Sequence, residues 1–138
     1  MEDLVKGLEA RGIKPTAIRL LILKALAGSG QAFSLLDIEG RLDTVDRSTI
    51  SRTLALFHRK RLIHSIDDGT GSVKYSVCRS DCTCALDDLH VHFCCTRCRK
   101  TFCLENLSIP GVTLPEGFVL ENINFVLKGL CGHCSRRP

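Results

Sequence analysis

Cysteine and histidine are concentrated in one short stretch of this chain, from His90 to Cys103. Its fourteen residues include two histidines and four cysteines, and a further Cys-x-x-Cys pair lies near the C-terminus. Thiolates and imidazoles are the side chains that hold zinc in proteins. The stretch therefore predicts metal binding.

The two Cys-x-x-Cys pairs are the most specific part of this signal. Each pair places two thiolates on a tight turn, and two such turns complete a tetrahedron around zinc. Four thiolates leave no open position for water or a substrate, so we expect a closed structural Zn(II) site. Its ligands are Cys95, Cys98, Cys131 and Cys134.

A second, regulatory metal site is expected around His90 and His92. These histidines alternate with Val91 and Phe93, so both imidazoles would lie on one face of a β-strand. Two imidazoles on one face make half of a metal site. Further candidate ligands are His64, Cys78 and, as an additional candidate, Cys103.

Each additional candidate also has a simpler explanation. A lone histidine at position 64 fits a hairpin surface, and a lone cysteine at 78 or 103 fits a small buried hydrophobe. Acting together, however, they would tie two distant parts of the chain to one ion. Cys82 and Cys84 lie close to this group in the sequence, and we assign them no role.

Length, charge and composition limit the possible classes of protein. A chain of 138 residues makes one ordinary domain or two small ones, and a net charge of +4 permits nucleic-acid binding without requiring it. No apolar run approaches the roughly 20 residues of a membrane span, and the N-terminus lacks a signal-peptide layout. We therefore expect a cytoplasmic protein, in which nine cysteines favour metal ligation or burial over disulfides.

The N-terminal half must position one side of the regulatory site, and its pattern is helical. A helix is expected over residues 3–11, and a second begins with Pro15 in its first turn. A third is expected over residues 34–42 with Ser34 as its N-cap, and a fourth follows Asp46. The second helix has a stripe expected to be buried, made of Ile18, Leu21, Ile22, Ala25 and Leu26.

The fourth helix has two different faces. Its apolar face consists of Ile50, Leu54 and Phe57, and the opposite face carries Ser48, Arg52, Ala55 and Arg59. Small residues beside arginines suit an approach to DNA, and a solvated surface would explain them equally well. Two alternating β-branched runs over residues 62–77, around the turn at 67–71, then predict a hairpin. Helices followed by a hairpin indicate a winged helix-turn-helix.

The expected fold class is therefore α+β. We expect a winged-helix DNA-binding domain over residues 1–80, a linker over 81–85, and a small α/β zinc-containing dimerisation domain over 86–138. The tail has a different composition from the first half because it is rich in cysteine and interrupted by Pro110, Pro115 and several glycines.

The chain resembles the ferric uptake regulator family of metal-responsive transcription factors over essentially its whole length, and most closely its zinc-sensing type. The matching segments are GIKPTAIRLLIL (12–23), STISRTL (48–54), IDDGTGSVKYSV (66–77), HVHFCCTRC (90–98) and GLCGHC (129–134). The resemblance implies a homodimer, with a sheet across the two-fold axis, that binds a palindromic A·T-rich operator. It implies a repressor and not an enzyme, with no membrane and no small-molecule substrate.

The resemblance also assigns residues. The four cysteines match the family's structural zinc ligands, and His90 and His92 match its regulatory histidines. Cys78 and His64 stand where zinc sensors have a cysteine and an aspartate, and Cys103 stands where iron and peroxide sensors have a carboxylate. Residues expected to contact DNA are Lys14, Arg19, Ser48, Thr49, Ser51, Arg52 and Arg59.

Several positions depart from the family pattern. Ser51 replaces a base-contacting tyrosine, Ala32 or Phe33 replaces a histidine ligand of iron sensors, and Arg99 replaces a glycine after the knuckle. Val91 replaces a ligand of a second surface site, and residues 104–128 lack the family's long amphipathic helix.

Ligand chemistry favours Zn(II) at the regulatory site because thiolate with imidazole suits zinc, whereas Fe(II) and Mn(II) prefer oxygen and imidazole. An iron- or peroxide-sensing regulator is the alternative, and a zinc-stabilised interaction module without DNA binding is a further one. A zinc deaminase would need a His-x-Glu, which is missing around His90 and His92.

Overall fold

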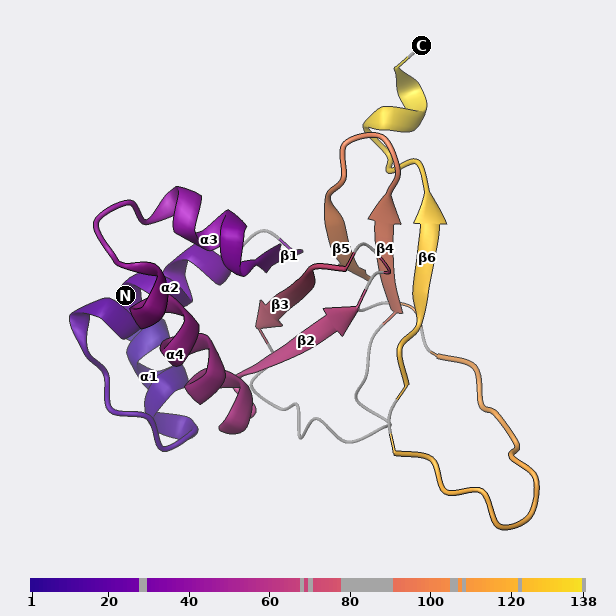
Figure 1. Ribbon diagram of the computed structural model, residues 1–138, viewed down its shortest axis with the longest axis horizontal. Coiled ribbons are helices and arrows are strands. Elements are labelled where there is room, and N and C mark those ends of the chain that lie inside the picture. The colour runs from indigo at the N-terminus through magenta and orange to yellow at the C-terminus, as the bar shows by residue number, and fades with distance from the viewer. Residues whose placement is uncertain are drawn as a thin grey trace.

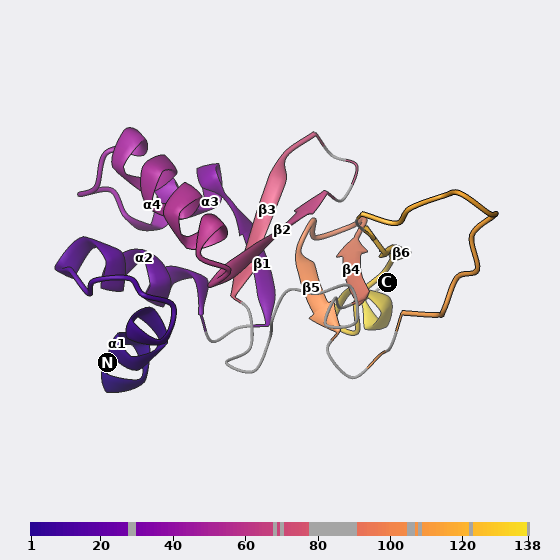
Figure 2. The ribbon, with the colours of Figure 1, turned by 90° about the horizontal axis from the view of Figure 1, so that it is seen from below.

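Four α-helices and a six-stranded sheet make up the part of the chain that the structure describes. This computed structural model describes residues 1–27, 30–67, 69, 71–77, 91–104, 107, 109–121 and 123–137. The helices gather at one end of the molecule and the C-terminal strands at the other, with the hairpin between them (Figures 1 and 2). The predicted mixed α+β architecture is confirmed. No helix among the described residues is long and apolar enough to cross a membrane.

The four helices begin and end at local signals in the sequence. They are α1 (Glu2–Ala10), α2 (Ala17–Leu26), α3 (Leu35–Arg41) and α4 (Arg47–Arg59). Gly12 has a φ of 70° just after α1, a conformation that glycine adopts without steric cost. Ser34 and Asp37 form a reciprocal capping box at the start of α3. Asp46 accepts the Thr49 N–H at 3.2 Å and caps α4 as predicted.

Two details of α2 were predicted wrongly. Thr16 is its N-cap, so Pro15 lies before the helix instead of in its first turn. Ile18 and Leu21 are 42% and 44% exposed, whereas Leu23 is buried. The buried face is turned toward Ile22, Leu23 and Leu26 because α1, α3 and α4 all contact this helix.

The α4 pattern is confirmed. Ile50, Leu54 and Phe57 are at most 2% exposed and belong to the core that the helices share. Ser48, Arg52, Ala55 and Arg59 lie on the exposed face.

The strands form one sheet in the order β2-β3-β1-β5-β4-β6. The predicted hairpin is present, with β2 and β3 antiparallel and His64 opposite Ser76. Strands β4 and β5 are antiparallel, and β4 and β6 are parallel. The strands are β1 (Gln31–Ser34), β2 (Ile63–Asp67), β3 (Val73–Val77), β4 (Val91–Cys95), β5 (Thr101–Leu104) and β6 (Val126–Gly129).

The short strand β1, which the sequence did not predict, joins the two halves of the sheet. Phe33 pairs with Tyr75 of the hairpin, and Ala32 pairs with Thr101 of β5. The predicted domain boundary falls within residues 78–90, outside the described residues. The division into 1–80 and 86–138 therefore stays a prediction.

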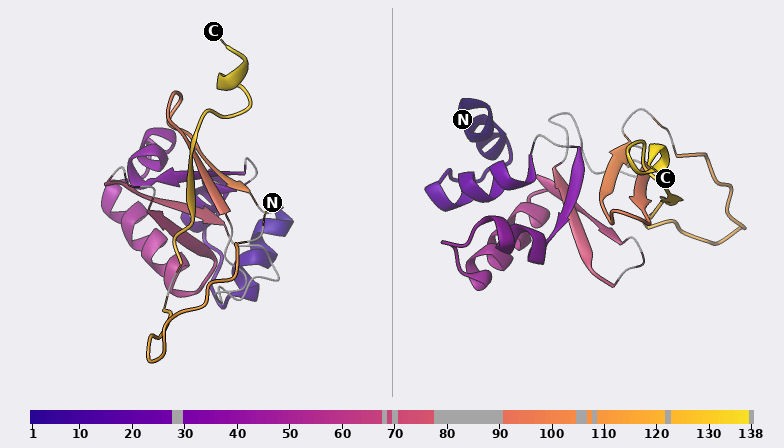
Figure 3. Two further views of the ribbon diagram at one scale, coloured as in Figure 1. Left: turned by 90° about the vertical axis from the view of Figure 1, so that its right-hand side faces the viewer. Right: turned by 90° about the horizontal axis from the view of Figure 1, so that it is seen from above.

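Among the described residues of the second half, most of the regular secondary structure is β-strand, and the described part of the segment between β5 and β6 is irregular. The only helical piece among these described residues is the 3-10 helix η2 (Cys134–Arg136), so the expected α/β character is reduced to a single turn. Figure 3 shows this turn projecting from the end of the strands, away from the helices. The prediction that residues 104–128 lack a long helix agrees with the described residues 109–121 and 123–125.

Candidate metal centres

The two predicted zinc knuckles lie side by side at one end of the sheet. Cys95 ends β4 and Cys98 follows it in the turn, whereas Cys131 follows β6 and Cys134 starts η2. The parallel pairing of β4 with β6, which sets Cys95 opposite Gly129, brings the two turns together. All four sulfurs lie within 4.8 Å of one another.

The geometry and hydrogen bonds of this cluster fit zinc. The sulfurs of Cys98 and Cys131 are 3.9 Å apart. A tetrahedron with Zn–S bonds of about 2.3 Å has an edge of about 3.8 Å. The backbone N–H groups of Cys131 and Cys98 point at the Cys95 sulfur, at 3.4 and 3.5 Å, as expected around a metal-bound thiolate.

The thiols differ in acidity. Hydrogen bonds from the backbone of Cys131 and Cys98 lower the pKa of Cys95 to about 5. Burial raises the pKa of Cys134 to about 12. A cation that binds here must therefore displace a proton from the buried thiol, and its charge then offsets that of the thiolates.

The turn after the first knuckle is tied to the hairpin by Lys74. Arg99 has a φ of 66°, which costs a non-glycine residue about 1–2 kcal/mol. Its carbonyl accepts a hydrogen bond from Lys74 Nζ at 3.4 Å, and the same Nζ donates to Thr101 Oγ1 at 2.9 Å. Lys74 is only 8% exposed. Sequence reasoning missed this residue because nothing in its local pattern distinguishes it from a solvated lysine.

A second ligand cluster lies between the hairpin and the C-terminal strands. His64 of β2, His92 of β4 and Cys103 of β5 bring their ligand atoms within 4.8 Å of one another. The imidazole rings have centroids 5.5 Å apart. His92 is 6% exposed, and the other two residues are half-buried.

The sheet register explains this convergence. His92 is the cross-strand neighbour of Cys103, and His64 is the neighbour of Ser76. The Ser76 hydroxyl lies 2.9 Å from the Cys103 sulfur, so the two pairs meet at the junction of the hairpin with β5.

Three of the five predicted regulatory ligands are thus brought together. Cys78 and His90 lie outside the described residues, so their roles stay predictions. Cys94 lies outside both clusters and is buried. The described residues therefore hold two metal-ligand clusters, consistent with one structural and one regulatory metal.

The predicted DNA-contacting residues lie around α4 and the start of α2. A pocket of about 290 Å³ is lined by Thr16, Arg19, Thr49 and Arg52, among others. Arg19 Nη1 donates to the carbonyl of Lys14 at 2.9 Å, which connects Lys14, a further member of the set, to this pocket.

Two of the predicted DNA contacts also serve the fold. The hydroxyl of Thr49 donates to the Asp46 carboxylate at 2.6 Å, and the Ser48 hydroxyl donates to it as well. These bonds lower the pKa of Asp46 to about 2. Ser48 and Thr49 therefore hold the N-cap carboxylate of Asp46 in place in the free protein. Ser51 and Arg59 are exposed.

The described architecture is thus a set of helices and a hairpin, joined through the cluster of His64, His92 and Cys103 to strands that carry the four-cysteine cluster. The model of the ferric uptake regulator family matches residues 10–124. The chain therefore belongs to the ferric uptake regulator family, whose members are metal-responsive transcription regulators and not enzymes.

Solved structures share this fold at low sequence identity. The ferric uptake regulator of Vibrio cholerae has a TM-score of 0.62 and 18% identity, covering 92% of this chain and 98% of its own. A zinc-bound manganese uptake regulator has a TM-score of 0.62 and 19% identity, covering 93% and 98%. Holo XcZur has a TM-score of 0.63 and 17% identity, covering 97% and 95%. No curated protein matches the chain. At such identities the structural likeness shows the shared fold alone. The metal that is sensed has to be inferred from the ligands of the site.

Proposed function

We propose that this chain is a zinc-responsive repressor that binds palindromic operator DNA as a homodimer when a regulatory Zn(II) is bound. One observation carries the proposal: His64 from the hairpin meets His92 and Cys103 from the C-terminal strands within 4.8 Å. A metal held there joins the DNA-binding part of the chain to the rest. Its occupancy therefore controls how the hairpin and the helices are held.

The donor set favours zinc. The cluster offers two imidazoles and a thiol, and no carboxylate belongs to it among the described residues. Thiolate with imidazole prefers Zn(II), whereas Fe(II) and Mn(II) prefer oxygen-rich sites. Cys78 or His90 would supply the fourth ligand of a tetrahedral site.

The mechanism we propose is a shift of population between two arrangements of the hairpin. The ligands from the hairpin and from the C-terminal strands could hold one zinc ion together only when the two halves are close, so metal binding would favour that arrangement. The Ser76 hydroxyl would then orient the thiolate of Cys103 by donating a hydrogen bond to it. Two contacts accompany this arrangement: Lys74 Nζ to Thr101 Oγ1 at 2.9 Å, and Asn124 Nδ2 to the carbonyl of Asp67 at 2.6 Å. Loss of the ligand bonds weakens the closed arrangement, and DNA affinity falls.

DNA is read by α4 in this proposal. Its exposed face carries Arg52 and Arg59 beside the small residue Ala55, which suits entry into the major groove. Arg19 and Arg52 line one pocket at the N-terminal end of α2, where a backbone phosphate would find two guanidinium groups and helix N–H groups.

A metal panel tests this function. The reduced protein, with its regulatory site free of metal, is titrated with buffered Zn(II), Fe(II) and Mn(II). Its binding to a DNA fragment from the protein's own promoter region is followed by fluorescence anisotropy. We expect activation by zinc at the lowest free concentration. Activation by iron alone would replace the zinc assignment with iron sensing, and metal-independent binding would contradict the regulatory site.

A further inference from the structure

The segment between β5 and β6 leaves the sheet and exposes its apolar side chains. We call its described residues, 107 and 109–121, the arm. It forms the long loop at the lower right of Figure 1 and extends away from the body of the molecule in Figure 2 as well. Val112 and Phe118 are 68% exposed and Val119 is 84% exposed. Adjacent large apolar side chains exposed in this way mark an interaction surface.

The end of the arm is a defined turn. The N–H of Phe118 donates to the carbonyl of Pro115 at 3.2 Å. Gly117 has a φ of 85°, the conformation that a type II turn requires at its third residue. The turn therefore presents Phe118 and Val119 in a fixed geometry, which lowers the entropy lost on binding.

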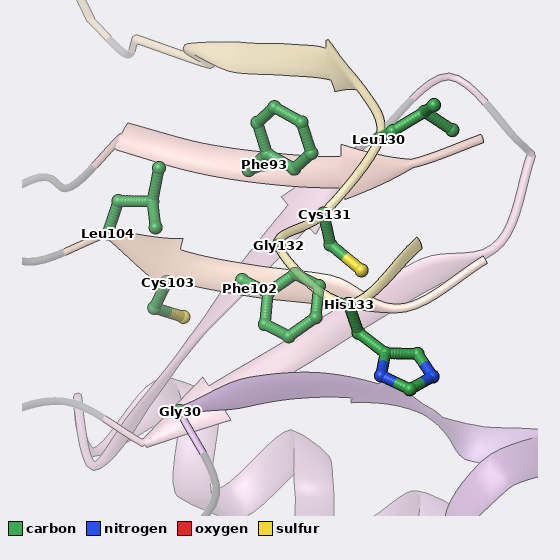
Figure 4. Close-up of a pocket in the computed structure, with 9 residues that line it drawn as sticks. All are labelled: Gly30, Phe93, Phe102, Cys103, Leu104, Leu130, Cys131, Gly132 and His133. Carbon is green, nitrogen blue, oxygen red and sulfur yellow. The ribbon is translucent and has the colours of Figure 1, made fainter. Parts of the chain in front are cut away.

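The face of the C-terminal strands has an apolar pocket of suitable size. Its volume is about 540 Å³, within the roughly 300–1,000 Å³ of ordinary binding pockets. Phe93 and Phe102 project into it from β4 and β5, and residues 130–133 form its far wall (Figure 4). Leu130 on that wall is 44% exposed. The described part of the second half has no α-helix that could cover this face.

The arm is acidic, and a guanidinium lies beside the pocket. Residues 101–127 contain no Lys, Arg or His, and the arm carries Glu116 and Glu121. His133 lines the pocket. The guanidinium of Arg136 is held beside it by a hydrogen bond of 2.6 Å from Nε to the Gly132 carbonyl. An acidic, apolar tip therefore complements an apolar pocket that has the Arg136 guanidinium beside it.

We propose that the arm of each chain inserts Phe118 and Val119 into this pocket of a second copy, with Glu116 facing His133 and Arg136. Reciprocal insertion uses the same two surfaces on both chains, as a two-fold symmetric dimer requires. The arm's own chain is a poorer recipient because the arm extends away from the sheet in both views (Figures 1 and 2). This inference rests on the homodimer of the proposed function and adds the element that holds it together.

Photo-crosslinking distinguishes the possible recipients. Benzoylphenylalanine replaces Phe118 in the full-length, zinc-loaded chain, and equal amounts of unlabelled and nitrogen-15-labelled protein are mixed and irradiated. We expect covalent dimers in which a light peptide containing position 118 joins a heavy peptide from residues 91–104 or 129–136. Cross-links within one chain, cross-links to another surface of the second copy, or no covalent dimer would each overturn arm exchange.

Matched variants measure the contribution of the tip. Phe118→Asp should raise the dimer dissociation constant by about tenfold or more in sedimentation experiments. Leu36→Asp is the control because Leu36 on α3 is similarly exposed, at 66%, and should leave dimerisation unchanged. Zinc content and circular dichroism verify that both variants fold. Equal dimerisation of Phe118→Asp and the unmodified protein would overturn the proposal.

A charge exchange tests the polar contact. Glu116→Lys should weaken the dimer, and combining it with Arg136→Glu should restore it. Failure of the double variant to recover would remove this contact from the proposal. A protein that forms the expected cross-links and binds no operator with any metal would contradict the proposed function and leave arm exchange intact.

Discussion

His64 and His92 place their imidazole centroids 5.5 Å apart, although one belongs to the hairpin and the other to the C-terminal strands. The short strand β1 makes this approach possible because it pairs with the hairpin on one side and with β5 on the other. A metal bound between these rings would hold the two halves in one relative position. That relationship is the basis of the proposed control of DNA binding.

Ser76 is predicted to position the metal-binding thiol. Its hydroxyl lies 2.9 Å from the Cys103 sulfur, so Ser76→Ala removes a hydrogen bond to the ligand without removing a ligand. We expect affinity for the regulatory zinc to fall by about 10–100-fold, the usual effect of losing such a partner. Competition with a zinc chelator measures this. Ser65→Ala is the control, since Ser65 is an exposed residue of the same hairpin. Equal zinc affinity in the two variants would exclude Ser76 from the site.

The four-cysteine cluster is predicted to hold the C-terminal half together. Cys95→Ser removes a fully buried ligand, and binding of a structural zinc contributes directly to folding. The variant should lose the structural zinc and the cooperative thermal unfolding of the unmodified protein. Cys94→Ser, next to it on β4 and outside the cluster, should retain both. A stable Cys95→Ser protein with unchanged zinc content would contradict this assignment.

Arg52 is predicted to contact DNA. Arg52→Ala should weaken operator binding by about tenfold. If Arg52 contacts a phosphate, the slope of log affinity against log salt concentration should also become less steep by about one. An unchanged slope with relaxed sequence preference would indicate a base contact instead. Lys6→Ala removes a cation from an exposed pair with Glu2 on α1 and should leave both quantities unchanged. If Arg52→Ala binds the operator with the same affinity as Lys6→Ala, α4 is not the helix that contacts the bases of the DNA.

Asp46 is predicted to make α4 sensitive to acid. Its pKa is lowered from 3.8 to about 2 by bonds from Ser48 and Thr49. A carboxyl whose pKa is lower in the folded state stabilises the protein above its unfolded pKa, and this contribution is lost as pH falls through the folded value. Asp46→Ala should therefore melt at a lower temperature at pH 7. The difference should shrink below about pH 4 and nearly vanish at about pH 2. Thermal melts followed by circular dichroism test this, and a difference independent of pH would show that the carboxylate charge does not contribute.

Local signals in the sequence predicted the helices, the hairpin and the four-cysteine cluster. Asp46 and Ser34 cap their helices through residues three positions away, and Cys-x-x-Cys spacing fixes a turn by itself. Strands β1, β5 and β6 are four residues each, too short to show a clear alternation, and they depend on partners distant in the sequence. The exposed Ile18 similarly depends on how α2 meets its neighbours.

The same distinction applies to the sites. The histidine and cysteine side chains indicated metal binding by their residue types alone. The family resemblance then assigned them to one regulatory site. The contacts of Lys74 with Thr101 and of Ser76 with Cys103 join residues 27 positions apart. Neither contact has a sequence signature, because both arise where the hairpin and β5 are brought together through β1.

The most direct test of the account compares zinc-dependent operator binding by the unmodified protein, His64→Ala and His92→Ala, at buffered free zinc. Each variant removes one imidazole from the cluster and leaves the four-cysteine cluster in place. We predict that both variants remain dimers with one zinc per chain and that zinc no longer strengthens their binding to the operator. His58→Ala, on α4 and outside both clusters, serves as a control for zinc content. Zinc-dependent binding that persists in His64→Ala and His92→Ala would contradict the central claim that this cluster couples metal to DNA.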